Sequence, residues 1–142
     1  MTNFSLYDQN ILPVGFKFPE KYTVLMSENF EEDIEPWSFL RRSDDITLSH
    51  YASMCEKYVN KKLIPFAIAV DLSGYYNDGY VVLACFDGDD PSGNSKIYFH
   101  DYGAPIKEID WSKRYSLDGF DAWLEFARAE SAHYKEERAE DE

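Results

Sequence analysis

Residues 79–105 read GYVVLACFDGDDPSGNSKIYFHDYGAP, in which an apolar run, an acidic turn and a second, alternating run follow one another. The continuous apolar run at 81–86 is typical of a central strand covered on both faces, and residues 96–100 alternate polar and apolar side chains. Between the two runs, Asp87, Asp89 and Asp90 lie among Pro, Gly and Asn residues, which favour turns. We therefore predict a β-hairpin whose acidic turn is presented to solvent.

Two further strands are predicted before this hairpin. Residues 63–70, LIPFAIAV, form a short apolar run with Pro65 near its start, where a missing ladder donor is tolerated. The turn-rich residues 71–79 then lead into the strand from Tyr80, which makes a second hairpin. Residues 37–40 look like a short strand that follows Pro36 and an exposed acidic connector.

Helical patterns occupy three other stretches. Pro19 suits the first turn of a short helix that ends near Asn29. A helix at 47–61, capped by Asp44, Asp45 or Thr47, is indicated by apolar residues at helical spacing. These residues are Leu48, Tyr51, Cys55, Tyr58 and Val59. After a mixed segment with Ile109 and Trp111, either Ser116 or Asp118 caps a third helix, whose inner face holds Phe120, Trp123, Leu124 and Ala127.

These elements predict a sheet that dominates the middle of the chain, together with three helical segments. The chain has 142 residues, of which 44% are hydrophobic and 17% aromatic, enough to fill one compact core. We expect a single domain over residues 1–142, which begins with an extended lead-in at 1–18 that packs onto the body. Residues 134–142 are expected to be a frayed acidic tail.

The charge favours a protein partner over nucleic acid or membrane. The formal net charge is -13, which repels phosphate backbones and anionic lipid surfaces. No apolar run approaches the roughly 20 residues of a membrane span, and the start of the chain lacks the features of a signal peptide. We expect a cytoplasmic protein with a basic partner.

No motif indicates an enzyme, a metal or a cofactor. Cys55 and Cys85 are expected to be buried thiols, and the acidic turn lacks the ligands of a calcium loop beyond its first positions. His100 and Asp101 are adjacent on a strand and so point to opposite faces. A hydrolase that uses His100 with Asp101 or Cys85 remains an alternative without a supporting motif.

A series of short motifs carries a resemblance to a known family. These are PW and FL at 36–40, LIPFA at 63–67, ACFD at 84–87, KIYFHDYGAP at 96–105 and FDAWLEFA at 120–127. Together they resemble the SUKH superfamily, the fold shared by a yeast cell-wall-synthesis regulator and many bacterial toxin-immunity proteins. The similarity spans roughly residues 12–127. The chain departs from the usual pattern at its start, where it has no long leading amphipathic helix.

The resemblance implies an α+β protein, a single domain whose helices pack around a mostly antiparallel sheet. It also implies a non-enzymatic binding module, with no catalytic residues to carry over. In bacterial toxin systems the implied task is to neutralise a cognate toxin, often a nuclease, by direct binding. A regulatory or scaffold protein of the same fold is the alternative. The motif residues themselves are typical of a core, so partner contacts are expected on acidic and tyrosine-containing loops. The candidates are Asp44, Asp45, Asp71, Tyr75, Tyr76, Asp78, Asp87, Asp89 and Asp90.

Overall fold

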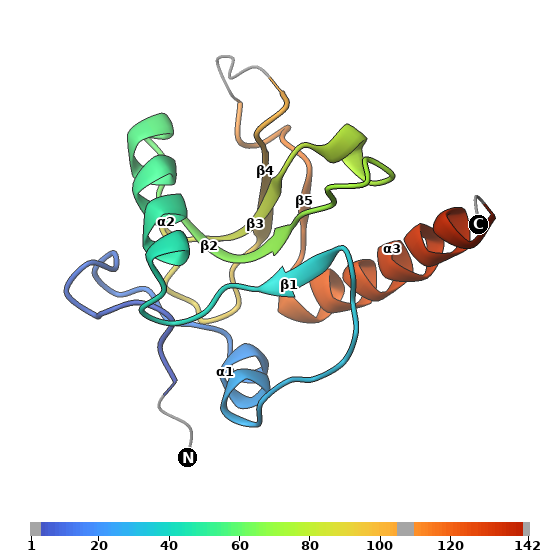
Figure 1. Ribbon diagram of the computed structural model, residues 1–142. Coiled ribbons are helices and arrows are strands. Elements are labelled where there is room, and N and C mark those ends of the chain that lie inside the picture. The colour runs from blue at the N-terminus through green and yellow to red at the C-terminus, as the bar shows by residue number, and fades with distance from the viewer. Residues whose placement is uncertain (1–3, 105–109, 141–142) are drawn as a thin grey trace.

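The computed structural model describes residues 4–104 and 110–140. Within them, a five-stranded antiparallel sheet in the order β1-β2-β3-β4-β5 carries α2 on one face and α1 and α3 on the other (Figure 1). The strands are β1 (Trp37–Phe39), β2 (Leu63–Ala69), β3 (Val82–Asp87), β4 (Ile97–Asp101) and β5 (Ser116–Leu117). The helices are α1 (Glu20–Ser27), α2 (Asp45–Lys57), a 3-10 turn η1 (Asn77–Gly79) and α3 (Phe120–Glu140). The predicted α+β single-domain class is confirmed.

Both predicted hairpins are present, and they share β3. In the β3–β4 hairpin Phe86 faces Ile97 and Val82 faces Asp101, while β2 pairs with the other edge of β3. Five of the six β3 residues are buried, as the apolar run at 81–86 predicts. Because a hairpin reverses direction at its turn, the β2–β3 connection and the β3–β4 turn lie at opposite ends of β3.

The sheet separates two apolar clusters. The larger lies on the face covered by α1 and α3, where the Phe66 and Phe86 rings stack at 4.1 Å and Trp123 packs against Phe66 at 5.0 Å. The smaller cluster lies on the α2 face. Its buried members are Met54, Tyr58, Leu63, Leu83, Cys85 and Tyr98.

The buried stripe of α2 differs from the predicted one. Thr47, Tyr51 and Met54 face the protein, whereas the predicted Leu48, Cys55 and Val59 are exposed. The Thr47 hydroxyl accepts a hydrogen bond from the Arg41 backbone N–H at 3.2 Å, which turns this side of the helix inward. The prediction of a buried thiol is therefore wrong for Cys55 and confirmed for Cys85.

The two ends of the described chain also refine the predictions. The lead-in packs onto the body through Leu6, Tyr7, Leu12 and Phe16, mostly as turns rather than extended chain. Ser116 is part of β5 and does not cap α3. That helix continues through Glu140 with Tyr134 buried, where a frayed tail was predicted. Ile109, Asp141 and Glu142 lie outside the described residues.

Candidate functional site

The candidate residues fall into three separate groups. Asp44 and Asp45 lie at the start of α2, and the second group lies in the β2–β3 connection, residues 70–81. The third group lies in the β3–β4 turn, at the opposite end of β3. The structure therefore offers two distinct loops as candidate surfaces rather than one acidic site.

At the start of α2, Asp44 has a structural task. Its carboxylate accepts the Ile46 backbone N–H at 2.8 Å and so caps the helix. Asp45 follows in the first turn and is exposed. Of this pair, Asp45 is the side chain presented to solvent.

Asp71 anchors the β2–β3 connection from inside. It is 5% exposed, and Oδ1 accepts hydrogen bonds from the backbone and hydroxyl of Ser73 and, at 2.9 Å, from the Tyr134 hydroxyl of α3. Oδ2 accepts the Tyr76 N–H at 2.8 Å. Burial raises the pKa of the Asp71 carboxyl, but these hydrogen bonds outweigh it and lower the pKa to about 2. The expectation that Asp71 is exposed is wrong, because four donors converge on its carboxylate.

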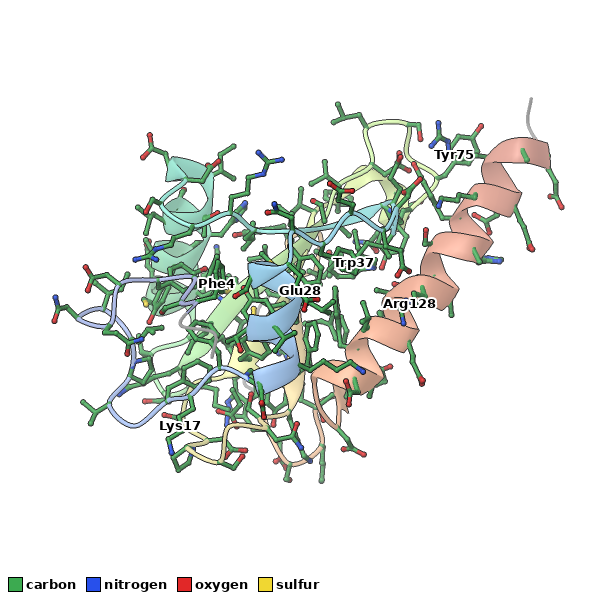
Figure 2. All side chains as sticks on the ribbon, turned by 90° about the horizontal axis from the view of Figure 1, so that it is seen from below. Phe4, Lys17, Glu28, Trp37, Tyr75 and Arg128 are labelled. Carbon is green, nitrogen blue, oxygen red and sulfur yellow. The ribbon has the colours of Figure 1, made fainter. Side chains whose placement is uncertain are left out.

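A second anchor ties the same connection to α3 one helical turn earlier. The Tyr76 hydroxyl donates to Glu130 Oε1 at 2.5 Å, and Trp37 Nε1 donates to the same oxygen at 3.1 Å. Tyr76 is therefore half-buried and structural rather than a free contact residue. Glu130 and Tyr134 are four positions apart, so they project from one side of α3. Figure 2 shows the neighbouring Tyr75 beside the C-terminal half of this helix.

The anchored connection presents apolar side chains to solvent. Leu72 is 97% exposed, Tyr80 57%, Val70 43% and Tyr75 39%. The Tyr80 ring lies directly on the backbone of Gly103, where a Cβ atom would come within 2.5 Å of it. Asp78 is exposed beside them, at a backbone φ of 54°. We call residues 70–80 the presenting loop.

Sequence reasoning included Tyr75 and Asp78 of this surface but missed Val70, Leu72 and Tyr80. It also missed the two anchors on α3. One local signal was available: an Asp followed two positions later by Ser, as at 71 and 73, favours a turn in which the carboxylate bonds the backbone. The link to Tyr134 spans 63 positions and had no local signal.

The β3–β4 turn is less exposed than predicted. Asp87 is largely buried and pairs with Lys61, with 2.9 Å between Oδ2 and Nζ, while Oδ1 accepts the Asp89 N–H. Asp89 is exposed and accepts the Lys62 N–H at 3.3 Å, and Asp90 accepts the Ser92 N–H at 2.9 Å. The prediction that all three acids project into solvent is wrong for Asp87, because the ammonium of Lys61 holds its carboxylate against the body.

His100 lies in a polar cluster under α2. Its Nδ1 is 2.6 Å from the Tyr58 hydroxyl, which also receives a 3.4 Å hydrogen bond from Arg114. Burial and the nearby cations Lys57 and Arg114 lower the pKa of His100 to about 4.

The hydrolase alternative gains no support from its other two members. The Asp101 carboxylate accepts hydrogen bonds from Asn77 and from the Gly103 backbone. Burial raises the pKa of the Cys85 thiol, whereas a nucleophilic cysteine needs a lowered pKa.

Metal-binding and membrane-spanning features are absent from the described part of the chain. Residues 4–104 and 110–140 contain no group of three or more His, Cys, Asp or Glu that could hold a metal ion. None of the described helices is both long enough and apolar enough to cross a membrane. In comparisons with known proteins, no family model, no curated protein and no solved structure matches the chain.

Proposed function

We propose that this protein is a non-enzymatic binding module that neutralises a cognate cationic toxin domain by direct binding through the presenting loop. The observation that carries this proposal is the combination of an apolar surface with a fixed backbone. Leu72 and Tyr80 project into solvent while Asp71, in the same loop, is buried and tied to α3. The anchor holds these exposed side chains in a fixed position, where a partner can contact them.

Anchoring favours binding because it removes an entropic cost. A flexible loop loses conformational freedom when a partner orders it, and each immobilised side chain costs about 0.5 to 1.5 kcal/mol. In the presenting loop the backbone is already fixed through Asp71 and Tyr76. Tyrosine and leucine on such a loop supply contact area. Most of the binding energy would come from the few of these side chains that fill a pocket of the partner.

The charge indicates the chemistry of the partner. At a net charge of -13 the protein attracts cationic surfaces over distances of about 10 Å at moderate ionic strength. The resemblance to the SUKH superfamily points to a bacterial toxin, such as a basic nuclease. Under the competing hypothesis, a regulatory or scaffold protein, the partner is not a toxin. A toxin gene immediately upstream favours the first, and a housekeeping neighbourhood favours the second.

The test is an affinity measurement with the product of a neighbouring toxin gene. Leu72→Ala should weaken binding roughly tenfold or more, as expected for a central apolar contact. Val59→Ala is the matched control. Val59 is 81% exposed and lies just after α2, at the end of β3 opposite to the presenting loop. Equal affinity of wild type and Leu72→Ala would contradict the role of the presenting loop. A loss at Val59 alone would move the binding surface toward the β3–β4 turn.

The acidic β3–β4 turn should act on the association rate. Asn at positions 89 and 90 keeps a carbonyl oxygen for the Lys62 and Ser92 N–H groups while it removes both charges. Asp89→Asn with Asp90→Asn should therefore slow association several-fold at low ionic strength, and the defect should shrink as salt rises. Association rates that do not change at any salt concentration would remove this turn from the steering surface.

A further inference from the structure

A hollow of about 730 Å³ lies under the β1 edge of the sheet. Phe30, Trp37 and Phe39 contribute to its apolar lining, and the residues on either side of β1 form its polar rim. In Figure 1, β1 borders the sheet with α1 below it and the 28–36 connection at one end. No residue of the presenting loop lines this hollow, so it is a second and separate surface.

The backbone of β1 is open on this side. The Pro36 carbonyl accepts the Val70 N–H, and the Leu40 N–H donates to the Phe66 carbonyl, so the backbone N–H and C=O groups of positions 36, 38 and 40 face β2. The backbone N–H and C=O groups of Trp37 and Phe39 therefore face the free edge of the sheet. The Trp37 N–H donates to Ile34, which leaves the Phe39 N–H and the Trp37 carbonyl without a partner among the described residues.

Opposite charges flank this open strand. Four carboxylates precede it, and three of them, at positions 32, 33 and 35, form exposed ion pairs with α3. Arg41 and Arg42 follow it, are exposed and form no ion pair within the described part of the chain. Segment 31–42, EEDIEPWSFLRR, thus reads acidic, then apolar, then basic.

We propose that a second copy of this chain pairs with the open edge of β1, antiparallel and about a two-fold axis at Ser38. In that register position 39 of one copy faces position 37 of the other, so the Phe39 N–H of each copy meets the Trp37 carbonyl of its mate. Because the two strands run antiparallel, Arg41 and Arg42 of each copy lie at the end of the pair where the acidic segment 31–35 of the other copy leads into β1. An isologous contact requires such a self-complementary segment, and the order of charges in 31–42 provides it.

The turn before β1 limits the pairing. The Trp37 N–H already donates to Ile34 within the same chain, and β1 is only three residues long, so the ladder is confined to a few residues. The contact closes on itself about the two-fold axis instead of continuing into a fibre. We therefore expect a weak, transient dimer.

Sedimentation of the intact chain with paired charge reversals tests this proposal. Arg41→Glu with Arg42→Glu places acid against acid, and Glu31→Arg with Glu35→Arg places base against base, so each double variant alone should dimerise at least tenfold more weakly than wild type. Mixed together, the two double variants should form heterodimers, because both contacts become complementary.

Lys62→Glu with Lys96→Glu is the matched control. It changes the net charge by the same amount as the arginine pair at two lysines outside the hollow, and it should leave the dimer unchanged. A wild-type chain that remains monomeric up to about 1 mM would overturn the proposal. So would a mixture of the two variants that associates no better than either alone, or a control that weakens the dimer equally.

Discussion

Replacing Asp71 with Asn tests whether the anchor that fixes the presenting loop is as strong as its contacts indicate. The amide oxygen can replace Oδ1 and keep the bonds from Ser73 and Tyr134. The amide nitrogen must then replace Oδ2, where it meets the Tyr76 N–H, so that two donors face each other. The variant loses one charge-assisted hydrogen bond and leaves a shielded donor unpaired.

The cost of this change is about 2 kcal/mol of unfolding free energy, from the range for hydrogen bonds to charged groups. The pKa gives a consistent magnitude. Lowering the pKa of Asp71 from 3.8 to about 2 corresponds to about 2 kcal/mol of stability at neutral pH. Because the folded-state pKa is lowered, this contribution is fully present above pH 3.8 and is lost as the pH falls toward 2.

Urea unfolding at pH 7 measures the effect, with Asp78→Asn as the control on the same loop. Asp78 is exposed, so its replacement should change the unfolding free energy by less than about 0.5 kcal/mol. The deficit of Asp71→Asn should shrink as the pH is lowered from 4 toward 2, since wild type then loses the same contribution. If Asp71→Asn were as stable as Asp78→Asn at pH 7, Asp71 would not be an anchor.

Groups outside the presenting loop give three further predictions. Because the pKa of His100 is lowered from 6.5 to about 4, its neutral form stabilises the fold above pH 6.5. That contribution is lost as the pH falls, so the unfolding free energy of wild type should drop by about 2 kcal/mol between pH 8 and pH 5. The unfolding free energy of His100→Gln should drop correspondingly less, as urea unfolding at both pH values will show. Iodoacetamide should alkylate Cys55 in the folded protein and Cys85 only after unfolding, as mass spectrometry of the labelled chain will show. Lys61→Met should cost about 2 kcal/mol in urea unfolding by leaving the Asp87 carboxylate buried and unpaired, whereas an unchanged midpoint would mean that this ion pair is not stabilising.

The strands could be predicted because their signals are local. The apolar run at 81–86 and the alternating run at 96–100 correspond to β3 and β4 within one or two residues. The two-residue strand β5 was not predicted, because so short an element has no periodicity to detect.

The inner face of α2 shows where periodicity is ambiguous. Two stripes, one through Thr47 and Met54 and one through Leu48 and Cys55, both have helical spacing. Hydrophobicity favours the second, but the hydrogen bond between Thr47 and the Arg41 backbone accompanies burial of the first. A polar contact of this kind is invisible to a count of apolar residues.

The candidate site was only partly predictable for a different reason. The sequence indicates that the β2–β3 connection is rich in acids and tyrosines, but not which of them point inward. Asp71 and Tyr76 are held by Tyr134 and Glu130, which lie more than 50 positions away. The aliphatic Leu72 is almost fully exposed beside the buried Asp71, the reverse of what their hydrophobicity favours.

Site-specific photo-crosslinking in the native host reports which surface of the protein meets a partner, even when that partner is unidentified. A photoreactive amino acid would replace Leu72 in one variant and Val59 in another, both of them exposed aliphatic positions. A basic protein should be crosslinked at position 72 and not at position 59, and Asp71→Asn should reduce the yield of that crosslink. Crosslinking to the same protein at position 59 but not at position 72 would contradict the assignment of the presenting loop as the binding surface.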